Sequence, residues 1–442
     1  MTGLNSVSAQ VCAAHGGTED ACLHREACAA VMRTHADRMA LDTVREDRGK
    51  ALPGWKGTQH MTALQWSQVH AWRMSQHGLS PRFISQDFLQ AVTRTDGIQA
   101  QVMSAAELAL CTRVEGLAPR DVQAAIFQDR TLVKTWAMRG TLHVLTASEF
   151  PLYVAARDWQ LTTSWSNYFA AFGLTTSAQQ EAFLSAIPHV LEQGPLTRPQ
   201  LADAVASHTG MAQARDFMLS ESWGTPLKPA AYRGDLCFGP GQGKTATFMN
   251  PRAWIEEWQP IPPQQALAEL ARRYLWAYGP ATSDDFRFWW GCGKTLAKSL
   301  FHSLVEELEE VEVEGWRAFA LRATVPLMQS VEPVEQIHLL PLFDAYTIGA
   351  PPRGGEPLLA AAYKSQVFNQ QGWAFAVVLV NGSIQGVWDY TIRRSHIVVK
   401  VNLFCSSTTA IRKGIAAEAE RLSHLFEKEF VLADESTSSS QL

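Results

Sequence analysis

Apolar and polar positions along this chain repeat in three stretches, and each stretch predicts a helix, a break at glycine and a second helix. The stretches cover residues 69–89, 190–201 and 274–286. In the second and third, the new helix follows Thr197 or Thr282, with Gln200 or first-turn acidic residues in the positions that favour helix capping. The pattern predicts three copies of one helical unit.

Each stretch is followed by a pattern typical of a β-hairpin. The predicted hairpins cover residues 131–145, residues 233–249 with a turn at 239–244, and residues 309–322 around Glu314-Gly315. Helix, turn, helix and hairpin together make up a winged helix. We therefore expect an α+β protein with three tandem winged helices, at residues 61–150, 178–255 and 262–325.

Residues 330–432 follow a different pattern, in which strands predominate. Apolar segments from 374 to 403, with the hairpin turn Asn381-Gly382, predict a β-meander. Residues 408–430 predict a closing helix. We expect these elements to form a separate α+β domain.

The two ends of the chain differ from its body. Residues 1–58 are polar, of mixed charge and without a motif, so we expect an appendage, disordered or partly helical, that is dispensable for the fold and for activity. An apolar-periodic helix is predicted to begin beside Met61. Residues 433–442 are serine-rich and are expected to be a disordered tail.

Composition narrows the class of protein. With 442 residues, 46% of them hydrophobic, the chain is long enough for several domains. It has no run of about 18 apolar residues and no secretory signal pattern, so we expect a cytoplasmic protein. The seven cysteines are scattered and never spaced C-x-x-C, which predicts free thiols, and metal-binding histidine motifs are absent. Because the net charge of the protein is −5, binding of a nucleic acid would require a locally basic face on the protein.

Two segments imitate a phosphate-binding loop, at residues 241–245 and 291–295. The Walker pattern needs a glycine five positions before the glycine of its Gly-Lys-Thr, but Phe238 and Phe288 occupy those positions. We therefore expect no binding of nucleoside triphosphates. Lys244 fits instead the tip of a wing, where it would contact a DNA phosphate.

Gln99 and Gln101 lie two residues apart in a segment that leads into a helix. On an extended backbone, such residues project to the same side, so the two amides would form one polar face. Ser104 and Glu107 follow as a capping-box pattern that predicts a helix over 108–114. On this pattern alone, the glutamines could cap nearby backbone groups or act as a catalytic amide pair.

The first predicted hairpin contains a second group of candidate residues. Residues 132–143 predict a strand, a tight turn at Arg139-Gly140 and a second strand. Trp136 and His143 lie within it. Both residue types more often serve packing or structure than chemistry.

Four segments together resemble the AlkZ/YcaQ-like winged-helix DNA glycosylases, over most of the chain from Leu64 to Leu425. They are residues 99–101, 130–143, 340–346 and 367–373. The resemblance implies three winged helices that scaffold a concave, basic cleft for duplex DNA. It implies that Gln99 and Gln101 are the catalytic pair of the AlkZ-type branch, since the YcaQ-like branch has an aspartate in place of Gln101. Asp344 matches an acidic residue of the family.

From this resemblance we expect a monofunctional DNA glycosylase that removes bulky N-alkylated purines, with interstrand crosslinks as a further substrate. It would be a monomer that binds double-stranded DNA and uses water, no cofactor and no metal. The expected residues are Gln99 and Gln101 as the catalytic pair, Lys134, Arg139, Lys244 and Arg393 as DNA contacts, and Trp136, His143 and Asp344 as active-site support. The alternative is a non-catalytic winged-helix DNA-binding protein, such as a transcriptional regulator, in which the glutamines are structural.

Overall fold

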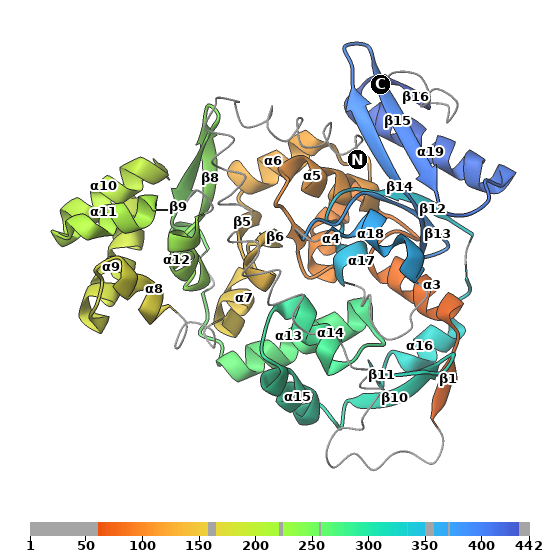
Figure 1. Ribbon diagram of the computed structural model, residues 1–442, viewed down its shortest axis with the longest axis horizontal. Coiled ribbons are helices and arrows are strands. Elements are labelled where there is room, and N and C mark those ends of the chain that lie inside the picture. Colours follow the sequence, from red (N-terminus) through yellow and green to blue (C-terminus); the bar gives the residue numbers. More distant parts are fainter. Residues whose placement is uncertain are drawn as a thin grey trace.

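The computed structural model describes residues 61–157, 165–220, 224–255, 258–333, 335–349, 358–369 and 372–432. The predicted appendage at 1–58 and tail at 433–442 lie outside the described residues. Figure 1 shows four groups of elements, with the first unit near the centre, the second at the left, the third below and a C-terminal sheet at the upper right. Helices and sheets are both well represented, which confirms the α+β class.

The first unit contains the segment that carries the two glutamines. Its elements are α4 (Phe88–Arg94), β3 (Ile98–Gln99), α5 (Met103–Arg113), α6 (Pro119–Phe127), β5 (Leu132–Trp136) and β6 (Leu142–Thr146). The short strand β3 pairs with β6, so the sheet has the order β3-β6-β5. α7 (Phe150–Arg157) follows the hairpin.

The second unit repeats this order of elements. They are α9 (Ser177–Val190), β7 (Leu196–Thr197), α10 (Arg198–Thr209), α11 (Ala212–Leu219), β8 (Cys237–Gln242) and β9 (Thr245–Met249). The sheet order is β7-β9-β8, equivalent to that of the first unit. The predicted turn at 239–244 is shorter than expected, because β8 continues to Gln242 and leaves only two residues between the strands.

The third unit has the same order again. It consists of α13 (Pro263–Tyr278), α14 (Ser283–Trp290), α15 (Lys294–Ser303), β10 (Leu308–Val313) and β11 (Trp316–Leu321). A single bridge between Ala281 and Phe319 takes the place of the short strand. The repetition predicted from the sequence is therefore present in the order of the elements.

The first copy of the repeated unit begins at a different helix from the one predicted. Helix α3 (Trp66–Gln76) was expected to be its first helix, but the repeated order begins at α4. The segment beside Met61 is also not helical. It forms β1 (Thr62–Leu64), which pairs in parallel with β10 of the third unit. The predicted periodicity therefore holds only from Trp66 onward.

Left-handed residues close two of the hairpins as predicted. Arg139 and Gly140 have φ of 56° and 71°, and Glu314 and Gly315 have φ of 47° and 90°. Glycine adopts this region at little cost, whereas other residues rarely do. The two dipeptides are therefore genuine turns, and Arg139 is held in an uncommon backbone conformation.

The C-terminal unit is a five-stranded sheet packed against one helix. Its strands are β12 (Ile337–Leu340), β13 (Val377–Val380), β14 (Ser383–Ile392), β15 (His396–Leu403) and β16 (Glu429–Leu432). They lie in sequence order, and the antiparallel pairing of β13, β14 and β15 confirms the predicted meander and its Asn381-Gly382 turn, while β16 pairs in parallel with β15. The closing helix α19 (Thr409–Phe426) is shorter than predicted, because Glu427 turns the chain into β16 with φ of 53°.

Further short elements lie between and within these units. They are β2 (Phe83–Ile84), β4 (Val114–Glu115), α8 (Ser166–Ala171), α12 (Lys228–Tyr232), α16 (Val325–Ser330), α17 (Ala345–Gly349) and α18 (Lys364–Val367). The first hairpin lies between two hydrophobic clusters. Trp136 belongs to the cluster of the second unit, while Met138 and Leu145 belong to that of the third. The turn at Arg139 is thus positioned by both neighbouring units.

Candidate active site

Gln99, His143 and Thr135 form a row across the sheet of the first unit. Gln99 of β3 lies opposite His143 of β6, and Thr135 of β5 lies opposite His143 on the other side. Residues directly opposite in antiparallel strands project to the same face. Gln99 is 7% exposed, and the other two are 1% exposed. Buried polar side chains of this kind need hydrogen-bond partners.

Arg139 supplies that partner for Gln99. Its Nη2 donates to Gln99 Oε1 at 3.0 Å and lies 3.4 Å from His143 Nε2. Its Nη1 donates to the backbone oxygen of Trp289 at 2.6 Å, at the end of α14. Burial lowers the pKa of Arg139 to about 10, so the guanidinium is charged at neutral pH. The turn residue thus connects the glutamine segment to the third unit.

The end of α14 approaches this turn closely because of a glycine. Gly291 ends the helix with φ of 83°, and a Cβ there would lie 2.9 Å from Arg139 Cα. Any other residue would force the two backbones apart. The segment at 291–295 is therefore a helix end followed by the start of α15, and not a phosphate loop.

Gln101 is held by the same hairpin at a different atom. The strand β3 ends at Gln99, and Ala100 N still donates to Leu142 O at 2.7 Å. The Gln101 side chain then takes the next backbone donor, because its Oε1 accepts from Leu142 N at 3.4 Å. Both glutamine carbonyls are thus directed to donors of the hairpin.

The position of Gln99 is a helix cap in the other two units. Thr197 of β7 directly precedes α10, and Gln200 Oε1 accepts from its backbone N at 2.9 Å. Thr282 follows the bridged Ala281 and caps α14 through Asp285. In both units, the polar residue that directly precedes the helix stabilises its first turn.

Gln99 is not used in this way, and the capping box predicted at Ser104 and Glu107 is wrong. Helix α5 begins at Met103, and its N-cap Val102 makes no side-chain capping bond. Ser104 is already inside the helix. Three non-helical residues therefore separate Gln99 from α5, which leaves its side chain available for other contacts.

The imidazole of His143 is neutral, and each of its ring nitrogens faces a hydrogen-bonding group. Burial and the nearby Arg139 hold its pKa well below the usual value. Its Nδ1 lies 3.0 Å from the carbonyl oxygen of Thr141, to which it donates, so Nε2 carries the lone pair that faces Arg139. The residue therefore supports the turn.

Trp136 fastens the hairpin to the second unit. It is buried, and its ring centroid lies 4.9 Å from that of Phe238 and 6.3 Å from that of Phe248. Gly224 lies against its other edge, where a Cβ would be 2.6 Å from the indole. These contacts are packing contacts, as expected for most tryptophans of this chain.

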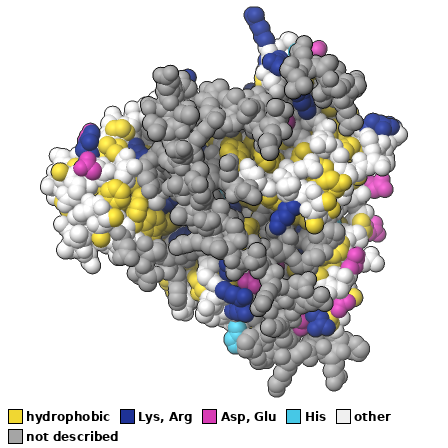
Figure 2. Space-filling model, viewed as in Figure 1, with side chains coloured by type: hydrophobic (Ala, Val, Ile, Leu, Met, Phe, Trp, Pro, Cys, Tyr) yellow, Lys and Arg dark blue, Asp and Glu magenta, His cyan; other side chains and the backbone are white. Residues whose placement is uncertain are grey.

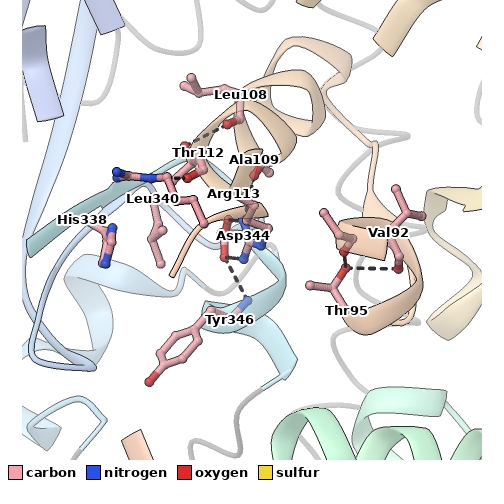
Figure 3. Close-up of polar contacts among 12 residues, drawn as sticks. Val92, Thr95, Leu108, Ala109, Thr112, Arg113, His338, Leu340, Asp344 and Tyr346 are labelled. Carbon is pink, nitrogen blue, oxygen red and sulfur yellow. Dashed lines mark hydrogen bonds and ion pairs between the residues drawn. The ribbon is translucent and has the colours of Figure 1, made fainter. Parts of the chain in front are cut away.

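Asp344 lies outside the polar row but next to helix α5 (Figure 3). Both of its oxygens accept from the guanidinium of Arg113 at 2.7 Å, and neither side chain is exposed. Its Oδ1 also accepts from Tyr346 N at 2.9 Å. Asp344 therefore joins the C-terminal unit to the helix that follows the glutamines.

The expected DNA contacts are dispersed. Lys134 is half-buried above the ring of Phe238, at 5.2 Å, and burial lowers its pKa. Lys244 is exposed at the β8–β9 turn and Arg393 at the β14–β15 turn. Figure 2 shows basic side chains at this projecting end of the C-terminal sheet. Arg139, in contrast, is directed inward and bonds protein groups.

Several residues near the glutamines gave no signal in the sequence. Thr135 contributes a buried hydroxyl without a hydrogen-bond partner. A Cβ on Gly140 would lie 3.0 Å from the hydroxyl of Tyr232 and 3.7 Å from Nζ of Lys228, so both side chains border the turn. Lys228 and Tyr232 follow Gly140 by 88 and 92 positions in the sequence. A local sequence pattern cannot reveal contacts between residues so far apart.

Other kinds of site are not seen in the part of the chain that the structure describes. No three His, Cys, Asp or Glu side chains there are grouped so as to hold a metal ion. The cysteines at 111, 237, 292 and 405 are free. None of the described helices has the length and apolar character that a membrane span requires.

Comparison with known proteins identifies the family. The model of the family described as DNA glycosylase AlkZ-like matches residues 92–425. The interstrand DNA cross-link repair glycosylase of Streptomyces sahachiroi is 35% identical over 333 residues, which are 73% of this chain and 87% of that protein. The solved structure of Streptomyces sahachiroi DNA glycosylase AlkZ matches with a TM-score of 0.73 and 31% identity, over 84% of this chain and 100% of that chain. The resemblance read from the motifs is thereby confirmed, and the chain belongs to the AlkZ-like family of DNA glycosylases.

Proposed function

We propose that this protein is a monofunctional DNA glycosylase that hydrolyses the N-glycosidic bond of bulky N-alkylated purines in duplex DNA. The observation that carries the proposal is the placement of Gln99 and Gln101 against one hairpin, the first held by Arg139 and the second by the Leu142 N–H. Because the Streptomyces relative is named a cross-link repair glycosylase, we extend the proposal to the unhooking of interstrand crosslinks.

The reaction suits a site built from amides. N-alkylation makes the purine cationic, so it can leave as a neutral molecule without being protonated. The C1′–N9 bond breaks with its electron pair going to the purine, the water oxygen bonds to C1′, and the water releases a proton to solvent. The protein then has to place the sugar and the water, and placement alone can supply a large part of the acceleration. The two carboxylates of a glycoside hydrolase are not needed.

We propose that the three repeated units are winged helices that together hold the duplex. The exposed Lys244 and Arg393 lie at hairpin turns, where a lysine or arginine can reach phosphates. The third hairpin carries four glutamates, at 309, 310, 312 and 314, and does not suit a phosphate contact. In this proposal the protein acts as a monomer in the cytoplasm and requires no cofactor.

The direct test is base release by the purified protein. Duplex DNA methylated at N7 of guanine should release 7-methylguanine, and a duplex crosslinked through two N7 positions should separate into single strands on a denaturing gel after cleavage of the resulting abasic sites. If the protein is instead a transcriptional regulator, it should bind one undamaged sequence tightly and release no base. That outcome would refute the proposed glycosylase activity.

Phosphate contacts predict a change in salt dependence. Lys244→Gln and Arg393→Gln should each lower affinity for all duplex sequences alike and reduce the slope of log Kd against log salt by about one unit, as a released counterion requires. Arg317→Gln is the matched control, because Arg317 is exposed on the glutamate-rich hairpin and should leave the slope unchanged. A slope that stays the same in Lys244→Gln would remove that residue from the interface.

A further inference from the structure

The donors around the two glutamines fix the direction of both amides. Arginine and a backbone N–H can only donate hydrogen bonds. The atom of Gln99 that faces Arg139 is therefore its carbonyl oxygen, and the same holds for the atom of Gln101 that faces the Leu142 N–H. In a planar amide, the NH2 group then lies on the other branch of the side chain, away from these donors.

We propose that Arg139 is a positioning residue that orients the Gln99 amide so that its NH2, and not its carbonyl, is the group offered to the substrate. The inference rests on the proposed function and specifies how the amide pair would act. It assigns to Arg139 an effect exerted through Gln99, in place of the phosphate contact expected from its location in a turn.

Arg139 is well placed to hold one orientation. Its guanidinium bridges Gln99 Oε1 and the Trp289 carbonyl, and His143 Nε2 lies 3.4 Å from the same Nη2 that bonds Gln99. Its own backbone is packed against Gly291. A guanidinium fixed at both ends loses little further entropy when it orders a neighbour. Rotation of the Gln99 amide would place an NH2 against a guanidinium, leaving two donors face to face.

This orientation decides what chemistry the glutamine can perform. An NH2 donates to a lone pair, so it can hold the oxygen of the attacking water or an acceptor atom of the purine, but it cannot take a proton from water. The positive end of the amide dipole also gives no stabilisation to a cationic sugar. The reaction would therefore depend on departure of the base ahead of water attack, with the amides acting on lone pairs and not as bases.

The variant Gln99→Glu separates the two ends of the side chain. Glutamate has the same shape and keeps an oxygen for Arg139, so the fold and the contact with Arg139 are retained. It replaces the NH2 donor by an acceptor. We expect the single-turnover rate of 7-methylguanine release, measured at saturating enzyme, to fall at least about a hundredfold while the melting temperature stays the same or rises. Release at the wild-type rate would overturn the inference.

Arg139 itself is tested by coupling to Gln99. Arg139→Met should lower the single-turnover rate at least about tenfold, and Arg139→Lys, which keeps one donor, should retain more activity. In a Gln99→Ala background, Arg139→Met should cost no further rate, because its effect passes through Gln99. Arg130→Met is the matched control, since Arg130 has the same φ of 56° and is exposed at the start of the same hairpin.

The outcomes distinguish the inference from the proposed function. If the wild-type protein releases no base from any alkylated duplex, the proposed function fails. If the wild type is active but Arg139→Met lowers the rate equally with and without Gln99, the function stands and Arg139 has only a structural role. Melting curves of each variant show whether a loss of rate follows from unfolding.

Discussion

Replacement of Gln99 or Gln101 by alanine is expected to lower the rate of base release by about a hundredfold or more, while duplex affinity stays within about a factor of ten. Each side chain bonds one hairpin group, so its removal costs little binding surface but leaves water and sugar unplaced. Loss of such a placement lowers rates on the order of a hundredfold or more. Single-turnover release of 7-methylguanine measures the rate, and a filter-binding titration on the same duplex measures the affinity.

Gln128→Ala provides the control for these two variants. Gln128 is an exposed glutamine just after α6 of the same unit, so its loss should change neither rate nor affinity. If Gln99→Ala and Gln101→Ala release base as fast as Gln128→Ala, both glutamines are structural. The transcriptional regulator would then regain support.

Asp344→Ala is expected to destabilise the protein by about 3 to 5 kcal/mol, because it leaves the charge of Arg113 buried without a counterion. Two hydrogen bonds of 2.7 Å and the cap of Tyr346 N are lost with the carboxylate. The loss should appear in the free energy of unfolding from denaturant titration, as a lower midpoint at similar slope.

Two further variants make the Asp344 experiment specific. The double variant Arg113→Met with Asp344→Leu removes both charges and should recover most of the stability. Asp203→Ala breaks the exposed pair with Arg215, whose side chains are 61% and 49% exposed, and should cost less than about 1 kcal/mol. A loss below about 1 kcal/mol in Asp344→Ala would mean that Arg113 finds another partner.

Local signals in the sequence were sufficient for several elements. The dipeptides Arg139-Gly140 and Glu314-Gly315 located two hairpins, because a glycine beside a polar residue favours the left-handed turn. Thr282 located the start of α14 through its capping box. Each of these features depends on residues within a few positions of one another.

Elements that depend on distant partners could not be predicted. Strand β3 has two residues, too few to show alternation, and exists because of β6 more than forty positions later. Residues 62–64 continue the apolar pattern of α3, yet pairing with β10 makes them a strand. The chain after Phe426 resembles a continued helix, but β15 provides an edge on which β16 forms.

The same limit applies to the candidate site. The motif indicated Gln99 and Gln101, and the turn was found with Arg139 in it. The direction of the Arg139 side chain depends on Trp289, which is 150 positions away, and on Gly291 beside it. From the sequence pattern alone, the side chain of an arginine in a turn is expected to be exposed. Only the packing of the third unit against the first turns this one inward.

In the second and third units, the residue equivalent to Gln99 also caps the next helix, whereas in the first unit helix α5 starts later and has a different N-cap. Thr197 and Thr282 each cap the helix that directly follows, so the range of side chains tolerated there is narrow. At Gln99 the helix begins four residues later and makes no such demand. A change of side chain at position 99 therefore does not remove a helix cap, and among the three copies of the unit, the first is the one in which this position is least constrained by the helix that follows it.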